Sequence, residues 1–267
     1  MTDKTLFSVV LPTFNRPKQL VRCLEALADQ DFPKARFEVI VVDDGGSQPL
    51  DGTVGAFDSR MRIKLLRQLN GGCAAARQFG IDHAQGEYLA FTDDDCTPAS
   101  DWLTQVESAL KRVPNCAVGG PTVNGAVDDL YAEATQSIVE TLTLSGRDAE
   151  GFVRYAPTSN LVFPAALFSA DGGLDRTWRI AGGEDRDLCA RWLDAGHRLF
   201  FEPLAKVIHC HRLTPQRFLG QHFDYGRGAW HYYTSLRPFR RLEKPALYPK
   251  LFLTPFRSQA LDRKSVV

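Results

Sequence analysis

Residues 88–95 have the sequence YLAFTDDD, an apolar run of strand length followed by three consecutive aspartates. A buried strand that ends in carboxylates places several oxygen ligands at the rim of a sheet, and these carboxylates repel one another unless a cation or a proton lies among them. The spacing of Asp93 and Asp95 suits Mg²⁺ or Mn²⁺ shared with the phosphates of a substrate. The alternative is a solvated acidic turn that precedes the helix expected near Asp101.

Strand-like and helix-like segments alternate through the first half of the chain. Apolar runs lie at residues 7–11, 37–42, 63–66 and 116–119, and segments with helical spacing lie at 17–27, 73–84 and 101–112. This alternation predicts an α/β fold with a parallel sheet covered by helices on both faces. Ligands of such sheets bind at the carboxyl ends of the strands. We therefore expect the loops at residues 12–16, 43–47 and 93–97 to converge in space.

The second half of the chain is less regular. We expect helices at residues 129–144 and from Gly183 to Gly196, and strands at 160–163, 199–201 and 206–210. From Thr214 onward the pattern is helical, aromatic and basic, with a Thr-Pro pair as a helix start.

The charge of the chain is unevenly placed. Its 267 residues, enough for one large α/β domain or two small ones, carry no formal net charge. Residues 212–267 hold 11 Lys or Arg and 3 Asp or Glu, a net charge of +8, so residues 1–211 carry −8. This extension suits an anionic partner such as a phospholipid surface or a phosphorylated acceptor. The alternative is that residues 212–267 extend into solvent or pack on the acidic residues 1–211.

The cysteines and the hydropathy pattern bear on the compartment. Six cysteines lie at irregular spacing without a CxxC pair, at Cys23, Cys73, Cys96, Cys116, Cys189 and Cys210. Most lie in apolar stretches, which predicts buried, reduced thiols and a cytoplasmic protein. The chain opens without a signal-peptide pattern and no apolar run reaches about 18 residues, so no membrane-spanning helix is expected. The basic extension favours peripheral attachment at the inner face of a membrane.

Two glycine-rich phosphate-binding motifs are absent, since the chain has neither GxxxxGK[ST] nor GxGxxG. Gly71 and Gly72, before the Ala-rich helix, could present backbone amides to an anion. A tight turn is the simpler interpretation of that pair.

A second group of carboxylates, Glu184 and Asp185, follows a glycine pair at an expected helix start. Acidic residues are common there because they interact favourably with the helix dipole. Their chemical interpretation is a general base held opposite a metal ion. His209 and His211 alternate on the last predicted strand, so both face one way and one of them is a candidate metal ligand. A zinc site is disfavoured because no spacing of Cys and His completes four ligands.

The segment from Asp93 to Thr97 also matches the DxDxT pattern of haloacid-dehalogenase-type phosphatases, in which the first aspartate is a covalent nucleophile. Those enzymes carry the motif on their first strand and a lysine before a late acidic pair. Here three strands precede the motif, Lys111 follows it too closely, and Lys206 comes after Glu184. The order of the motifs argues against a phosphatase.

Four segments together resemble the ordered motifs of family-2 glycosyltransferases with the GT-A fold. They are VVLPTFNR at 9–16, VIVVDDG at 39–45, GEYLAFTDDD at 86–95 and GEDRDL at 183–188. The resemblance implies an α/β, GT-A-type fold whose Rossmann-like, mostly parallel sheet is flanked by helices. Residues 1–211 would form the catalytic domain and 212–267 a helical C-terminal extension. The implied reaction is metal-dependent, inverting transfer of a sugar from a nucleotide-diphosphate sugar to an acceptor hydroxyl, in glycan, lipopolysaccharide or glycolipid biosynthesis.

The resemblance also implies roles for individual residues. It places Pro12, Thr13, Asn15, Arg16, Asp43, Asp44, Arg77, Asp93 and Asp94 around the nucleotide-sugar, with Asp44 at the base and Arg77 near the diphosphate. It makes Asp95, Asp93 and His209 the ligands of Mn²⁺ or Mg²⁺, Asp185 the catalytic base, and Glu184 the residue that orients the acceptor. Cys96 departs from the commonest motif, in which many relatives have a further Asp, and Asp94 replaces a small residue.

The implied partners are a nucleotide-sugar donor, with UDP-sugars favoured, and a hydroxyl acceptor, which is lipid-linked in many members of the family; no nucleic-acid partner is expected. A non-catalytic nucleotide-sugar-binding protein of the same fold is the alternative. Loss of the base or of the DxD pair would favour it, and both are present here. The motif Tyr225-Gly226-Arg227-Gly228 in the extension receives no role from the resemblance.

Overall fold

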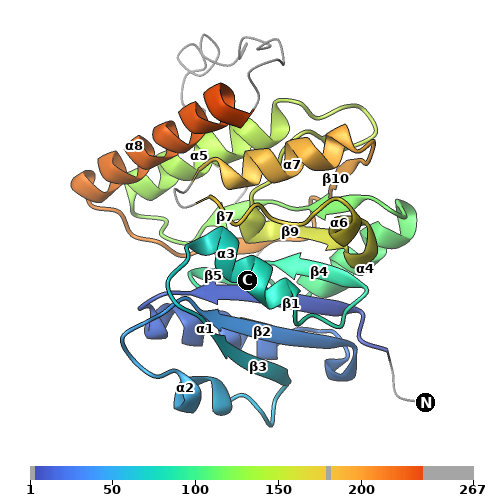
Figure 1. Cartoon of the computed structure of the whole chain (residues 1–267), viewed down its shortest axis with the longest axis vertical. Coiled ribbons are helices and arrows are strands. Elements are labelled where there is room, and N and C mark those ends of the chain that lie inside the picture. The colour runs from blue at the N-terminus through green and yellow to red at the C-terminus, as the bar shows by residue number, and fades with distance from the viewer. Residues whose placement is uncertain (1–3, 179–181, 237–267) are drawn as a thin grey trace, which may run out of the picture.

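The structure, a computed structural model, describes residues 4–178 and 182–236 (Figure 1). Its main sheet has eight strands in the order β3-β2-β1-β4-β9-β6-β10-β8. These strands are β1 (Phe7–Thr13), β2 (Phe37–Asp43), β3 (Arg62–Arg67), β4 (Tyr88–Phe91), β6 (Ala117–Gly119), β8 (Phe152–Val153), β9 (Leu161–Pro164) and β10 (Leu199–Phe201). A smaller sheet, in the order β5-β11-β7, contains β5 (Cys96–Pro98), β7 (Thr122–Asn124) and β11 (Val207–His209).

Helices lie on both sides of the main sheet. The described α-helices are α1 (Pro17–Ala28), α2 (Asp51–Gly55), α3 (Cys73–Ile81), α4 (Trp102–Arg112), α5 (Leu130–Leu144), α6 (Ala165–Ala170), α7 (Glu184–Asp194) and α8 (Pro215–His231). Short 3₁₀ turns, η1 (Lys34–Arg36) and η2 (Thr158–Asn160), and a π-helical turn, η3 (Tyr232–Leu236), complete the described elements.

Strand β1 shows why the sheet is covered on both faces. All seven of its residues are buried, because alternate side chains point into two different cores. Val9 and Leu11 pack in the core that includes the apolar side of α1. On the other face, a Cβ added at Gly80 of α3 would lie 2.6 Å from Cγ1 of Val10, so α3 rests directly on the strand. The predicted α/β sheet with helices on both faces is confirmed.

The direction of the strands is mixed rather than uniform. Strands β1, β2, β3 and β4 are mutually parallel neighbours, as expected for alternating strands and helices. Strand β9 lies between β4 and β6 and is antiparallel to both. The mostly parallel sheet that the resemblance implied is confirmed, and β9 is the strand that departs from the parallel direction in its centre. An apolar run sets burial but not direction, so the sequence of β9 carried no signal for this reversal.

Three local expectations need correction. The Ala-rich helix ends at Ile81 rather than at residue 84, because the amides of His83 and Ala84 bond to carbonyls three residues back. The aspartates lead into the short strand β5 before α4 begins. Cys73 is exposed and Cys210 is partly exposed, whereas the other four cysteines are buried as expected.

The C-terminal extension begins with a helix, as predicted. Thr214 caps α8 by accepting a hydrogen bond from the Arg217 amide at 3.3 Å. Helix α8 lies beside α5 (Figure 1), with the rings of Tyr131 and Phe218 5.3 Å apart. Residues 237–267 of the extension lie outside the described residues, so the predicted domain boundary at 211/212 stays a prediction. Among the helices of the described residues, none has the length and apolar character needed to cross a bilayer.

A buried amide joins the two sheets. Asn160 accepts a hydrogen bond from Nε1 of Trp102 at 2.9 Å and donates to the carbonyl oxygens of Pro121 and Ala205 at 3.0 and 2.8 Å. The Asn160 side chain is 1% exposed, so no solvent can replace these bonds. Pro121 lies next to β7 and Ala205 next to β11, so Asn160 holds the smaller sheet against the larger one.

We therefore expect Asn160→Ala to destabilise the fold by about 3 kcal/mol, because it leaves the Trp102 donor and the Ala205 carbonyl without this partner inside the protein. The Pro121 carbonyl keeps its bond from the Val207 amide. Urea unfolding followed by circular dichroism measures this change. Gln216→Ala, an exposed substitution on α8, is the control and should change stability by less than about 0.5 kcal/mol. Equal stability of the two variants would contradict the role of Asn160.

Candidate active site

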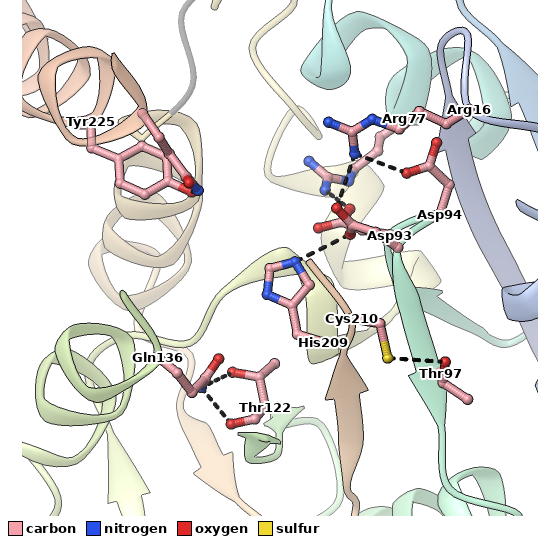
Figure 2. Close-up of polar contacts among 12 residues, drawn as sticks. Arg16, Arg77, Asp93, Asp94, Thr97, Thr122, Gln136, His209, Cys210 and Tyr225 are labelled. Atoms are coloured by element: carbon pink, nitrogen blue, oxygen red, sulfur yellow. Dashed lines mark hydrogen bonds and ion pairs between the residues drawn. The ribbon is translucent and has the colours of Figure 1, made fainter. Parts of the chain in front are cut away.

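Three loops at the carboxyl ends of β1, β2 and β4 converge, as the sequence predicted. Thr13 Oγ1 donates a 2.7 Å hydrogen bond to Asp94. Arg16 contacts Asp94 and Asp95 at 3.2 and 2.9 Å, and Figure 2 shows Arg16 beside Asp94. Asn15 Oδ1 accepts bonds from the amide and the hydroxyl of Ser47 at 2.8 and 3.0 Å. The parallel order of these strands brings residues 30 to 80 positions apart within hydrogen-bonding distance.

Asp94 is the most enclosed of the three aspartates. Burial raises the pKa of its carboxyl to about 6, although the bond from Thr13 and the charge of Arg16 oppose this rise. The middle aspartate therefore points into the protein toward β1. Its position differs from that of Asp93 and Asp95, which pair with Arg77 and His209 instead.

Asp95 and His209 form an ion pair between β11 and the loop after β4. Oδ1 of Asp95 lies 3.2 Å from Nε2 of His209 (Figure 2). Burial alone would raise the pKa of Asp95, but the hydrogen bond and the charge of His209 hold it at about 2. The pKa of His209 is raised in turn, against the effect of burial, by the same bond. Each group therefore favours the charged form of the other.

Potential metal ligands lie together at this pair. One ligand atom from each of Asp95, Cys96 and His209 lies within 4.8 Å of the other two. A carboxylate oxygen and an imidazole nitrogen are ligands that Mn²⁺ accepts. Burial raises the pKa of Cys96 well above its usual value, so its thiol is a weak ligand. The rings of His209 and His211 lie 4.1 Å apart, and neither nitrogen of His211 has a partner among the described residues.

Asp93, the other predicted ligand, is paired differently. It accepts a hydrogen bond from Nη2 of Arg77, a side chain of α3 that is only 3% exposed. The Nε and Nη1 groups of Arg77 are buried without a partner among the described residues. Burial alone would lower the pKa of Arg77, but the acidic neighbours, among them Asp93 and Asp185, raise it. Arg77 is therefore a fixed cation with donors left for an anionic ligand.

The loop after β2 carries Asp43 and Asp44. Asp43 accepts a hydrogen bond from the Gly46 amide at 2.8 Å and pairs with Arg67. Asp44 accepts three bonds, from Gln68 and from the amides of Gly71 and Gly72. The anion held by the glycine pair is thus a carboxylate of the protein itself. Since a carboxylate has about four lone-pair sites, Asp44 keeps one acceptor site for a ligand.

A cavity of about 370 Å³ lies at the same edge of the sheet. Its lining comprises Asn15, Pro17, Lys18, Gln19, Asp43, Gly46, Ser47, Gln48 and Leu50. Pro12, which was predicted to line a nucleotide pocket, is buried within β1 beside it. A larger cavity of about 560 Å³, beside Arg154 and Arg186, includes none of the predicted site residues.

Glu184 and Asp185 occupy the N-terminus of α7. Glu184 is held by the amides of Gly182 and Gly183 at 2.8 and 3.0 Å. Asp185 accepts bonds from the hydroxyl and the amide of Thr158 at 2.7 and 3.3 Å. Burial raises the pKa of both carboxyls, to about 7 for Glu184, where the charge of Asp185 adds to the effect. Such a pair can accept a proton near neutral pH.

Sequence reasoning missed Thr158. It lies in the 3₁₀ turn η2, directly before β9, and it alone orients Asp185 among the side chains of the described residues. A threonine in a Pro-Thr-Ser-Asn segment is typical of an ordinary turn. Only the position of η2 beside α7 distinguishes it from other turns.

Comparison of the sequence with known proteins identifies the family to which this chain belongs. A model described as "Glycosyl transferase family 2" matches residues 8–172. The chain is 33% identical over 232 residues to the pre-mycofactocin glycosyltransferase of Mycobacterium tuberculosis, covering 83% of this chain but 46% of that protein. It is 30% identical over 228 residues to glycosyltransferase AglE of Haloferax volcanii, covering 83% of this chain and 72% of that protein.

Solved structures give the fold. The mannosyltransferase PcManGT of Pyrobaculum calidifontis, in complex with GDP-Man and Mn²⁺, matches 90% of this chain and 66% of its own with a TM-score of 0.70 at 18% identity. TarS 1–349 of S. aureus, in complex with UDP-GlcNAc, matches 80% of this chain and 61% of its own with a TM-score of 0.61 at 21% identity. The predicted GT-A fold is confirmed by these neighbours. From its matched sequence model and its relatives, the chain belongs to glycosyltransferase family 2.

Proposed function

We propose that this protein is an inverting glycosyltransferase that moves a sugar from a nucleotide-diphosphate sugar to an acceptor hydroxyl. The observation that carries the proposal is the position of Arg77, a buried cation with free donors that interacts with both Asp93 and Asp185. A diphosphate at Arg77 would lie between the aspartate cluster and the carboxylates at the start of α7. Departure of the leaving group and attack by the acceptor need opposite sides of one carbon, and this arrangement supplies both.

The donor side of the proposed site consists of the loops after β1, β2 and β4. Thr13, Asn15 and Arg16 would contact the nucleotide-sugar beside the cavity at the loops after β1 and β2, which Asn15 lines. Asp44, with one acceptor site left, would take a hydrogen bond from a base N–H. Uracil has such a donor at N3, so a UDP-sugar is the favoured donor. The neighbours solved with UDP-GlcNAc and with GDP-Man show that both base types occur within this fold.

A divalent cation fits the Asp95 and His209 pair, since the two side chains provide an oxygen and a nitrogen on one side of the site. Asp93 is the third proposed ligand, once a bound diphosphate shares its Arg77 contact. When bound there, Mn²⁺ or Mg²⁺ would neutralise the charge that develops on the departing diphosphate. Arg16 and Arg77 add fixed positive charge beside the same position.

On the acceptor side, Asp185 would accept the proton of the attacking hydroxyl. Thr158 fixes its orientation, and burial raises its pKa, which makes the carboxylate a stronger base. Glu184, tied to the Gly182–Gly183 turn, would orient the acceptor. A nucleotide-sugar-binding protein without catalysis would not need a carboxylate held in this way.

Contact of the extension with an anionic membrane stays a proposal. On α8, Leu219, Phe223 and Trp230 are each more than two-thirds exposed, which suits an interface with lipid. Phe218 and Tyr225 instead face the rest of the protein. The basic and aromatic residues after Leu236 lie outside the described residues.

Removal of the metal should stop turnover. We expect Asp95→Asn to lower the release of nucleotide from UDP-sugars on the order of a hundredfold, because it removes a charged ligand. EDTA should inactivate the wild type, and Mn²⁺ or Mg²⁺ should restore it. Asp58→Asn, an exposed change on the surface, is the control. Undiminished turnover after exhaustive chelation would refute the metal proposal.

The base can be tested separately from donor binding. Asp185→Asn should lower sugar transfer by about a thousandfold or more, yet bind the nucleoside diphosphate with an affinity near that of the wild type, because the base acts on the acceptor. Thr158→Val should give a smaller loss, since it removes only the orienting hydroxyl. Asp51→Asn, in the first turn of α2, is the matched control. If Asp185→Asn transfers sugar within about tenfold of wild type, another residue is the base.

The pH dependence of kcat/KM should report the ionisation of the proposed base, Asp185. Since the base works when ionised and burial raises the pKa of Asp185, kcat/KM should rise with pH along an acidic limb that lies above the usual range of an aspartate. Glu184→Gln removes a neighbouring negative charge, which lowers the pKa of Asp185 and moves the acidic limb to lower pH. The profile is measured at two Mn²⁺ concentrations. A limb that shifts with metal concentration would instead report protonation of His209.

A further inference from the structure

The motif Tyr225-Gly226-Arg227-Gly228 packs against the turn that precedes the proposed base. Gly182 has a φ of +96°, and a Cβ added there would lie 2.6 Å from Cα of Tyr225. A Cβ added at Gly183 would lie 2.7 Å from the carbonyl oxygen of Gly228 and would overlap Trp178. The Gly182–Gly183 turn and α8 therefore touch backbone to backbone, with no room for a side chain between them.

Contacts with α5 and with Trp178, in addition to those with the Gly182–Gly183 turn, hold helix α8 in this position. The amide of Leu213, just before the helix, donates a 2.8 Å bond to Asp129 at the start of α5. Oγ1 of Thr135 on α5 lies 3.0 Å from Nε2 of His222. At the other end of α8, the ring of His231 lies 5.1 Å from that of Trp178. The helix is thus fixed at several points along its length, which makes it a rigid support for the turn.

The side chain of Tyr225 extends from α8 toward the cluster of Asp93 and Arg77 (Figure 2). Its phenol oxygen accepts a 2.5 Å hydrogen bond from Nε2 of Gln221, one turn earlier on the same helix. Burial, together with the charges of Asp185 and Glu184, raises the pKa of Tyr225 to about 12, so the hydroxyl keeps its proton. None of the described residues accepts that proton in a hydrogen bond. The O–H donor is therefore free for a ligand.

The position of Tyr225 relates it to the acceptor rather than to the donor. The proposed donor contacts come from the loops after β1, β2 and β4, which lie with Arg77. Tyr225 instead contacts Gly182, whose amide holds Glu184, one residue from the proposed base. In the proposed reaction the acceptor hydroxyl gives its proton to Asp185. A side chain beside Asp185, such as Tyr225, would therefore face the acceptor.

We propose that α8 forms the acceptor wall of the active site, with Tyr225 as the residue that positions a polyhydroxylated, sugar-like acceptor. The Tyr225 O–H donates a hydrogen bond to one oxygen of the acceptor, and the phenol ring lies against its C–H face. A different hydroxyl attacks: its oxygen bonds to the anomeric carbon, the bond from that carbon to the diphosphate breaks, and its proton goes to Asp185. This inference rests on the proposed glycosyl transfer.

The test compares Tyr225→Phe and Tyr225→Ala with Phe223→Ala, a control on the outward side of the same helix, where Phe223 is 68% exposed. UDP-sugars with Mn²⁺ are screened against a panel of p-nitrophenyl glycosides and free sugars, and the fastest wild-type pair is used. Tyr225→Phe should raise the acceptor KM about fivefold, the effect of one hydrogen bond, and leave the donor KM and UDP affinity unchanged. Tyr225→Ala should lower kcat/KM for the acceptor about a hundredfold.

Thermal melting separates function from folding, because Tyr225→Phe keeps the ring and its packing even if Tyr225→Ala unfolds. If Tyr225→Phe has the acceptor KM of Phe223→Ala, the positioning role is wrong. A rise in the donor KM alone would place Tyr225 on the donor side and would also overturn it. If the wild type releases no nucleotide from any donor with any acceptor, the proposed glycosyl transfer itself fails, and the role of Tyr225 fails with it.

Discussion

The rest of the site depends on one electrostatic constraint: three consecutive carboxylates at the end of β4 have to coexist within the protein. Three cations from three different elements relieve their repulsion, namely Arg16 before α1, Arg77 on α3 and His209 on β11. Helix α3 directly precedes β4 in the chain, whereas α1 and β11 are far from it. The fold therefore brings countercharges to residues 93–95, and the proposed phosphate and metal ion would bind at this cluster.

The second pair of carboxylates is stabilised differently, and that difference gives it different chemistry. Glu184 and Asp185 are held by backbone amides and by the hydroxyl of Thr158 rather than by a cation of their own. Asp95, beside His209, has a pKa of about 2 and stays ionised, whereas burial raises that of Glu184 to about 7. The same kind of side chain thus suits a ligand at one position and a base at the other.

Helix α8 links this electrostatic arrangement to the end of the described chain. Its backbone meets the Gly182–Gly183 turn too closely for any side chain, so the geometry of the proposed base depends on a helix more than 30 residues further on. One side of α8 packs on α5 and Trp178, and its other side exposes Phe223 and Trp230. The helix is therefore part of the proposed active site and also exposes apolar side chains to solvent.

The sequence by itself determined the alternation of strands and helices, the convergence of three loops and the two groups of carboxylates, because apolar runs, glycines and prolines act locally. Only the tertiary structure decided the antiparallel direction of β9, the attachment of Asp94 to Thr13 and the use of the Gly71 and Gly72 amides by Asp44. It also decided that Thr158 orients Asp185. These are contacts between residues far apart in the chain, and no local pattern specifies which of several possible partners a polar side chain will meet.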